Sequence, residues 1–267
     1  MTISIYQVDA FSDRPFGGNP AAVCLLDEDQ DDAWMQAMAA EMNLSETAFP
    51  KRLDGNRVSL RWFTPTLEVD LCGHATLAAA HVLWESGAFD RAATIEFETR
   101  SGSLFAKRID DWIELDFPAQ PVRSLNPVPS ILLDGLGLHE AEFVGTDGVD
   151  YVVEVDQAAT VRQLVPNQAL LERLPIRGVT VTAAADDDDR YDFISRFFAP
   201  AAGIPEDPVT GSAHCSLATY WALRLDKTEF LAYQASDRGG ELKVSLLGDR
   251  VKLCGQAVTV FTGQVLA

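Results

Sequence analysis

The stretch Glu206-Asp207-Pro208-Val209-Thr210-Gly211-Ser212-Ala213-His214-Cys215 leads into an apolar segment, Leu217 to Leu225. The apolar segment predicts a buried helix, with the polar groups just before or at its start. A helix start has free backbone N–H groups and a partial positive charge, so it binds anions and favours thiolates. Acidic groups, a hydroxyl, an imidazole and a thiol gathered there indicate either a functional site or an ordinary helix cap with a glycine turn.

A second stretch, Cys72-Gly73-His74-Ala75-Thr76, begins another apolar run. If Cys72 is aligned with Cys215, Ala75-Thr76 falls on Ala218-Thr219. The segments upstream also match, with a longer insert in the second half: Arg61-Trp62-Phe63-Thr64-Pro65 and Arg196-Phe197-Phe198-Ala199-Pro200. A repeat of this kind changes the prediction for the whole fold. We therefore expect an internal duplication, with chance matching of small residues as the alternative.

Composition narrows the class of protein. The chain has 267 residues, 47% of them hydrophobic, which is enough for one large globular domain or two smaller ones. Lys and Arg number 21 against 40 Asp and Glu, and the net charge of −19 argues against a nucleic-acid partner. The N-terminus lacks the features of a signal peptide, and no apolar stretch is long enough to span a membrane. Four cysteines without a CxxC pair suggest reduced thiols, so we expect a soluble cytoplasmic protein.

The order of strand and helix patterns predicts an α+β fold in two similar halves. Each half is expected to consist of mainly antiparallel strands around one apolar helix. A proline-rich segment, Pro118 to Pro129, marks the boundary between them. The first half is predicted to span residues 1–118 and the second 119–256, with a final strand at 257–267 that packs on the first half.

Two halves of this kind could face each other across a cleft into which two helix starts point. Such a cleft suits proton removal beside a carboxyl group, which needs an anion clamp and acid/base groups. Glu46 lies at a helix-to-strand junction between Leu44 and Phe49, where partly apolar surroundings would raise its pKa toward that of a general base. Asn19 ends a glycine turn and could donate to a carboxylate. An exposed loop glutamate and a plain hairpin are the alternatives.

Other chemistries find less support in the sequence. No Gly-x-Gly-x-x-Gly, P-loop or Gly-x-Ser-x-Gly motif is present. Cys72, His74, His214 and Cys215 would be acceptable zinc ligands, but their spacing matches no zinc pattern. A structural site of these four ligands would also leave no open position for chemistry. We expect no metal.

The sequence resembles the PhzF-like (phenazine biosynthesis) family, which has the diaminopimelate-epimerase-like fold. The resemblance implies two similar halves related by a pseudo-two-fold, each a mainly antiparallel strand barrel wrapped around a central helix. The resemblance covers essentially the whole chain. It is carried by Asp9-Ala10-Phe11, Gly17-Gly18-Asn19-Pro20-Ala21, Asn43-Leu44-Ser45-Glu46-Thr47-Ala48-Phe49, Arg61-Trp62-Phe63-Thr64-Pro65, Cys72-Gly73-His74-Ala75-Thr76 and Glu206 to His214. It implies a metal-free and cofactor-free isomerase that acts on a small anionic (carboxylate) substrate. It also implies a homodimer, since many family members are dimers.

The resemblance also implies roles for individual residues. Glu46 matches the acid/base glutamate that moves a proton within the substrate. His74, Asp207 and Ser212 match residues that line the site and assist protonation or substrate binding. The anion-holding backbone positions match Gly73 and the Gly211-Ser212 pair, and Asn19 is expected to contact the substrate.

Two other functions stay open at this point. Cys72 and Cys215 fall where diaminopimelate epimerase carries its two catalytic thiols, so a two-thiol amino-acid epimerase or racemase is chemically conceivable. A non-catalytic protein that binds small anions or a partner is the second alternative. The sequence does not specify the physiological substrate, because fold-level analogy does not transfer pocket selectivity.

Overall fold

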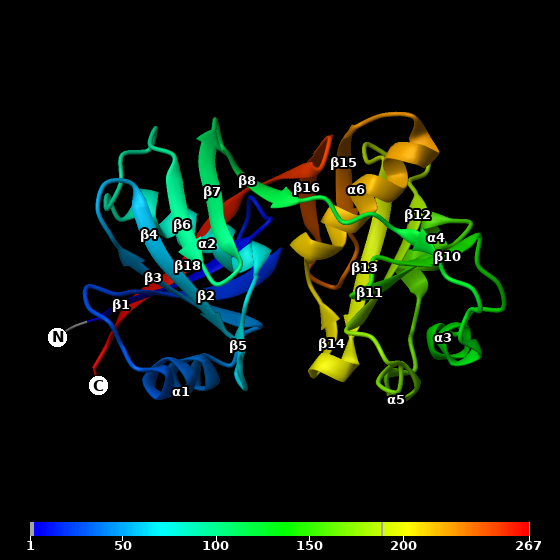
Figure 1. The fold of residues 1–267 in the computed structure, drawn as a ribbon, viewed down its shortest axis with the longest axis horizontal. Helices are drawn as coiled ribbons and strands as arrows, with labels where there is room; N and C mark the ends of the chain where they lie inside the picture. The colour runs from blue at the N-terminus through cyan, green and yellow to red at the C-terminus, as the bar shows by residue number, and fades with distance from the viewer. Residues whose placement is uncertain (1–2, 188, 267) are drawn as a thin grey trace. The chain divides into compact units, whose positions relative to one another are not determined.

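The computed structural model describes residues 3–187 and 189–266, and it has the predicted α+β class. The chain forms two compact units, Met1–Phe117 with Lys252–Ala267 and Pro118–Val251 (Figure 1). The second crossing falls inside the strand Arg250–Gly255, between Val251 and Lys252. This strand pairs with the strand Trp112–Pro118. Among the described residues, no helix is long and apolar enough to cross a membrane.

The first unit is a series of paired strands around one helix. Its elements are β1 (Ile3–Ala10), β2 (Asn19–Leu25), α1 (Asp32–Met42), β3 (Glu46–Arg52), β4 (Arg57–Phe63), β5 (Glu68–Val69), α2 (Gly73–Glu85), β6 (Ile95–Thr99), β7 (Gly102–Ile109), β8 (Trp112–Pro118) and β18 (Ala257–Val265). Strands β18, β1 and β2 pair antiparallel, β2 and β3 parallel, and β3 and β4 antiparallel. Strands β4 and β6 then pair parallel, and β6, β7 and β8 antiparallel.

The second unit repeats this series. Strands β9, β10 and β11 pair antiparallel, β11 and β12 parallel, β12 and β13 antiparallel, β13 and β15 parallel, and β15 and β16 antiparallel. The elements are β9 (Arg123–Ser124), α3 (Ser130–Leu136), β10 (Phe143–Thr146), β11 (Asp150–Glu154), α4 (Ala158–Gln163), α5 (Gln168–Leu171), β12 (Gly178–Ala184), β13 (Phe193–Ala199), η1 (Pro200–Ala202), β14 (Ile204–Asp207), α6 (Gly211–Leu225), β15 (Glu229–Gln234) and β16 (Gly240–Leu247). Strand β17 (Arg250–Gly255) begins in this unit and continues into the first. The repeated pairing order supports the internal duplication.

The strand register relates the two repeats residue by residue. In the first unit Trp62 pairs with Val69, and in the second Phe197 pairs with Asp207. An arginine one residue earlier makes the same two-pronged ion pair in each unit. Arg61 donates to both carboxylate oxygens of Glu68 at 2.7 Å, and Arg196 to those of Glu206 at 2.7 and 2.8 Å.

This register corrects the alignment of the two cysteines. The number of residues between the paired residue and the helix start is the same in both units, from Val69 to Gly73 and from Asp207 to Gly211. Gly73 therefore corresponds to Gly211, and Cys72 corresponds to Thr210. Cys215 lies in the second turn of α6. The matching Ala-Thr pairs had favoured the wrong alignment, because small residues recur on any closely packed helix.

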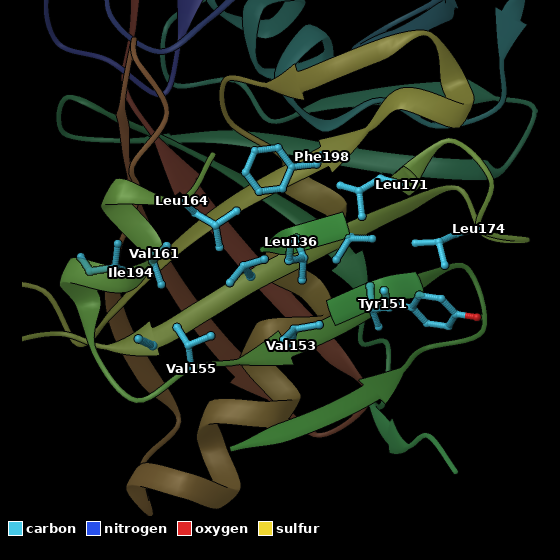
Figure 2. Packing of buried hydrophobic residues seen from close by; sticks show 14 of the residues in the cluster. Leu136, Tyr151, Val153, Val155, Val161, Leu164, Leu171, Leu174, Ile194 and Phe198 are labelled. Carbon is cyan, nitrogen blue, oxygen red and sulfur yellow. The ribbon is translucent and has the colours of Figure 1, made fainter. Parts of the chain in front are cut away.

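Each central helix is buried because strands surround it. Helix α2 packs on β1, β2, β3 and β18, and its alanine-rich sequence lets those strands approach closely. In the second unit, Trp221 of α6 donates to Thr182 of β12 and stacks on Phe193 of β13. Alternate residues of the same strands, including Val181 and Ile194, join a second apolar cluster with the short helices α3 to α5 (Figure 2). The strands β12 and β13 are therefore covered on both faces.

One glycine in the turn before β2 is required by the backbone. Gly18 has φ +61°, and a Cβ atom there would lie 2.1 Å from the carbonyl oxygen of Ala10. Left-handed backbone costs a residue with a Cβ about 1–2 kcal/mol, and the clash adds to that cost. We expect Gly18→Ala to lower the free energy of unfolding by at least about 2 kcal/mol in urea titrations. Gly55→Ala is the matched control, because Gly55 also has positive φ but open space around it. Equal losses in the two variants would show that the close approach to Ala10 has no effect.

Candidate functional site

The first unit brings four predicted residues together at the start of α2. Strands β2 and β3 run parallel, so Asn19 and Glu46 at their first positions lie on the same edge of the sheet. Cys72 is the N-cap of α2, and His74 lies in its first turn. Asn19 Nδ2 is 3.2 Å from His74 Nδ1, Cys72 Sγ is 3.6 Å from the same nitrogen, and Glu46 Oε2 is 3.2 Å from His74 Nε2.

The imidazole of His74 is neutral at physiological pH. Burial lowers its pKa from 6.5 to about 3, because the charged form loses its hydration. With Asn19 Nδ2 donating to Nδ1, the single ring proton is assigned to Nε2, which faces Glu46. The contact of Nε2 with the carboxylate is close, yet within the described residues Nε2 has no aligned hydrogen-bond partner. A buried polar atom of this kind suits a site that exchanges protons with a bound molecule.

The same residues do not suit a metal centre. Ligand atoms of Glu46, Cys72 and His74 lie within 4.8 Å of one another. However, the thiol faces Nδ1 and the carboxylate faces Nε2, and a histidine ligates one ion through one ring nitrogen. His214, named in the zinc alternative, uses both ring nitrogens elsewhere, Nδ1 with the Thr210 carbonyl at 2.8 Å and Nε2 with Ser195 Oγ at 3.5 Å.

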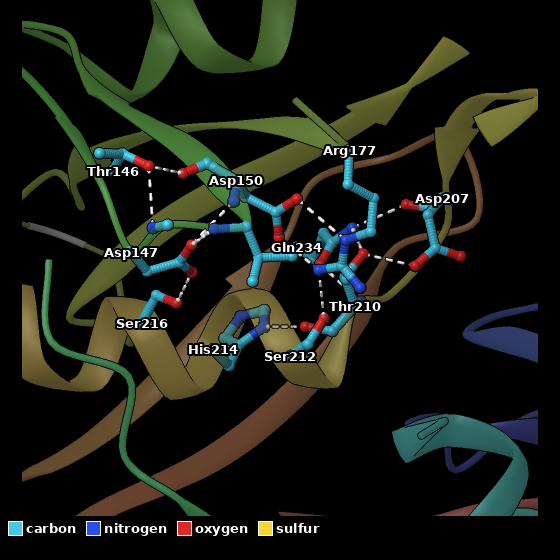
Figure 3. Close-up of polar contacts among 12 residues, drawn as sticks. Thr146, Asp147, Asp150, Arg177, Asp207, Thr210, Ser212, His214, Ser216 and Gln234 are labelled. Carbon is cyan, nitrogen blue, oxygen red and sulfur yellow. Dashed lines mark hydrogen bonds and ion pairs between the residues drawn. The ribbon is translucent and has the colours of Figure 1, made fainter. Parts of the chain in front are cut away.

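In the second unit, a buried glutamine fixes the loop before α6 (Figure 3). Gln234 Nε2 donates to the Asp207 carbonyl at 2.7 Å, and Gln234 Oε1 accepts from the Thr210 backbone N–H at 2.8 Å. The Thr210 hydroxyl donates to Asp207 Oδ2, so it does not cap the helix. Asp207 is thus held in place directly ahead of Gly211 and Ser212, the first two residues of α6.

Two further polar residues of this unit were missed by the sequence analysis. Arg177 donates through Nε to Asp150 Oδ1 at 2.9 Å and through Nη2 to the second carboxylate oxygen (Figure 3). The same Nη2 donates to Ser212 Oγ at 3.0 Å. Asp150 is only 2% exposed, and burial raises its pKa although Arg177 opposes that rise. No local pattern marks these two residues, which lie far apart in the chain.

The two thiols of the epimerase alternative have different settings. Cys72 is at a helix N-cap beside an imidazole, whereas Cys215 lies inside α6 and burial raises its pKa to about 12. Cys24 is buried in β2 with a similarly raised pKa, and Cys254 is partly exposed. The position of Cys215 therefore does not fit that of a catalytic thiol at a helix start.

We expect Cys24 and Cys215 to resist alkylation by iodoacetamide in the native protein at pH 8. Their thiolate fractions are about a thousandfold below that of an ordinary thiol of pKa 9.0. Peptide mass spectrometry with and without urea measures this, with partly exposed Cys254 as the internal reference. Fast modification of Cys215 without urea would contradict the burial of this thiol.

Comparisons with known proteins place the chain in one family. A model of the family described as phenazine biosynthesis-like protein matches residues 8–263. An uncharacterized isomerase of Halalkalibacterium halodurans is 53% identical over 266 residues, covering 100% of this chain and 99% of that protein.

Solved structures agree. The crystal structure of a PhzF-family phenazine biosynthesis protein from Enterococcus faecalis has a TM-score of 0.93 at 39% identity, and the match covers 100% of both chains. A structure described as a predicted epimerase from Pseudomonas aeruginosa has a TM-score of 0.78 at 23% identity, covering 99% of each chain, and shows the same fold. This chain therefore belongs to the phenazine biosynthesis-like (PhzF-like) protein family and is an isomerase.

Proposed function

We propose that the protein isomerises a small carboxylate substrate by general acid/base proton transfer, without a cofactor, and that Glu46 moves the proton. The observation that carries this proposal is the contact of the Glu46 carboxylate with the buried, neutral imidazole of His74, 3.2 Å from Nε2. A carboxylate and a neutral imidazole in contact offer both an acceptor and a donor for protons. A binding role alone does not require such a pair.

In this mechanism Glu46 takes a proton from a carbon next to a carbonyl or carboxyl group of the substrate. It then returns the proton to another carbon, so atoms and charge balance without a co-reactant. The negative charge that develops in between needs hydrogen-bond donors. The backbone N–H groups at the start of α2 are suited to this, because the side chain of the N-cap residue Cys72 does not cap them.

Asp207, Gly211 and Ser212 of the second unit are proposed to serve the same reaction, as the family resemblance implies. Their support is the fixed loop, in which Gln234 and Thr210 hold Asp207 ahead of the helix. Asn19 is proposed to set the tautomer of His74 in addition to any contact with substrate. The homodimer and the cytoplasmic location stay predictions.

Proton NMR in D₂O tests the proposed function. The protein is added to a panel of amino acids, diaminopimelate, proline derivatives and a dihydro-hydroxyanthranilate. Loss of a carbon-bound proton signal, or its appearance at a new position, supports proton-transfer chemistry and names the substrate class. If the wild type exchanges no proton in any member of the panel, the proposed function is not supported for these classes of carboxylate.

The thiol epimerase keeps one supporting observation, the 3.6 Å contact of Cys72 with His74. Cys72→Ala separates the two mechanisms on any substrate that exchanges. Exchange that survives this change favours the glutamate, and exchange that is lost in Cys72→Ala but kept in Glu46→Gln favours the thiol.

A further inference from the structure

The duplication places different charges at one equivalent point of the two units. In the first unit Thr47 pairs with Phe63, and in the second Val179 pairs with Phe198, which is the repeat equivalent of Phe63. Glu46 therefore corresponds to Gly178. A Cβ atom at Gly178 would lie 2.4 Å from the ring of Phe197, so there is no room for a side chain at this position.

The charged group of the second unit comes instead from Arg177, the residue just before Gly178. Its guanidinium lies over the ring of Phe197, 5.6 Å from the centroid, and makes the paired hydrogen bonds to Asp150. Where the first unit presents a carboxylate beside the start of its helix, the second presents a cation beside Ser212.

The hydrogen bond to Ser212 determines what that hydroxyl can do. Arg177 donates to Oγ at 3.0 Å, so the serine oxygen is the acceptor and its own hydrogen must point elsewhere. A hydrogen bond from a cation also polarises the O–H group and strengthens it as a donor. A donor of this kind recognises an anionic group better than a neutral one.

We propose that Arg177, anchored by the buried Asp150, is a positioning residue that orients and polarises the Ser212 hydroxyl as a donor to the anionic group of the substrate. This inference rests on the proposed function, to which it adds the residue that selects for charge.

The exposure of the pair argues against a purely structural ion pair. The side chain of Arg177 is 41% exposed while that of Asp150 is 2% exposed. The buried carboxylate is costly to desolvate, so the intact pair adds little net stability to the fold.

The test compares Arg177→Gln, Ser212→Ala and the double variant on a panel carboxylate that the wild type exchanges. Each single change is expected to raise KM about 10- to 100-fold, the range for a charged hydrogen bond, with kcat changed less than threefold. The KM of the double variant is expected to be no higher than that of the single variant with the higher KM, because Arg177 acts through Ser212. The carboxamide of the same compound should lose little in any variant. Effects that add, or that are equal for carboxylate and carboxamide, would overturn the proposal.

Two controls separate this role from stability and bulk charge. Asp150→Asn with Arg177→Gln removes both charges, so no unpaired carboxylate stays buried, and it should reproduce the KM effect. Arg224→Gln removes a cation of similar exposure from the other end of α6, where it pairs with Glu154, and should leave KM unchanged.

The proposal can also fail independently of the catalytic one. If the wild type catalyses no exchange, saturation-transfer NMR measures binding of L-proline and L-prolinamide as probes. If Arg177→Gln and Ser212→Ala weaken the binding of L-proline but not that of L-prolinamide, the inference is supported. Unchanged binding in the variants, or no preference of the wild type for proline, overturns it.

Discussion

Glu46→Gln is expected to slow substrate proton exchange by about 10²- to 10⁴-fold, the usual contribution of a general acid/base group. The amide keeps the shape of the side chain but cannot accept a proton from carbon. The neutral His74 beside it remains in place, because burial and Asn19 hold the ring. Rates in D₂O by proton NMR, at saturating and at low substrate, measure the change. The loss should appear in kcat, since the base acts on the reacting atoms.

Glu98→Gln is the matched control, because Glu98 is a partly exposed carboxylate of the same unit that pairs with Arg57. It removes the same charge and should leave the exchange rate within about twofold. An active Glu46→Gln variant would refute the assignment of Glu46 as the base, whatever the effect at Glu98.

The first-unit cluster could be predicted because each of its residues is tied to a local pattern. Cys72 and His74 open an apolar run, and Glu46 sits where a helix pattern gives way to a strand pattern. Parallel pairing of β2 and β3 then brings Asn19 and Glu46 to one edge. The fold class followed from the same patterns.

The Arg177–Asp150 pair could not be predicted, because it depends on the pairing of segments far apart in sequence. Asp150 starts β11 and Arg177 precedes β12, and the parallel pairing of these strands sets Asp150 opposite Gly178. The cysteine alignment failed for a related reason, since only strand register shows that Cys72 corresponds to Thr210.

Acid is expected to destabilise the protein through its buried histidines. Burial lowers the pKa of His74 to about 3 and that of His214 to about 4, against 6.5 for an ordinary histidine. The unfolded chain therefore binds more protons than the folded one below about pH 6.5, so stability is full above that pH and is lost as pH falls toward the folded pKa values. From pH 7.5 to pH 5 each histidine contributes a loss of roughly 2 kcal/mol, about 4 kcal/mol together.

Other titrating groups change the size of this loss without removing it. His81 also has a pKa lowered by burial and adds to the loss, whereas the raised pKa of Asp150 opposes it. Urea titrations at pH 7.5, 6 and 5 measure the free energy of unfolding. His214→Asn should shrink the difference between pH 7.5 and pH 5 by about 2 kcal/mol, because the amide can still donate to the Thr210 carbonyl without titrating. The same pH dependence in His214→Asn and the wild type would mean that this imidazole does not take up a proton on unfolding.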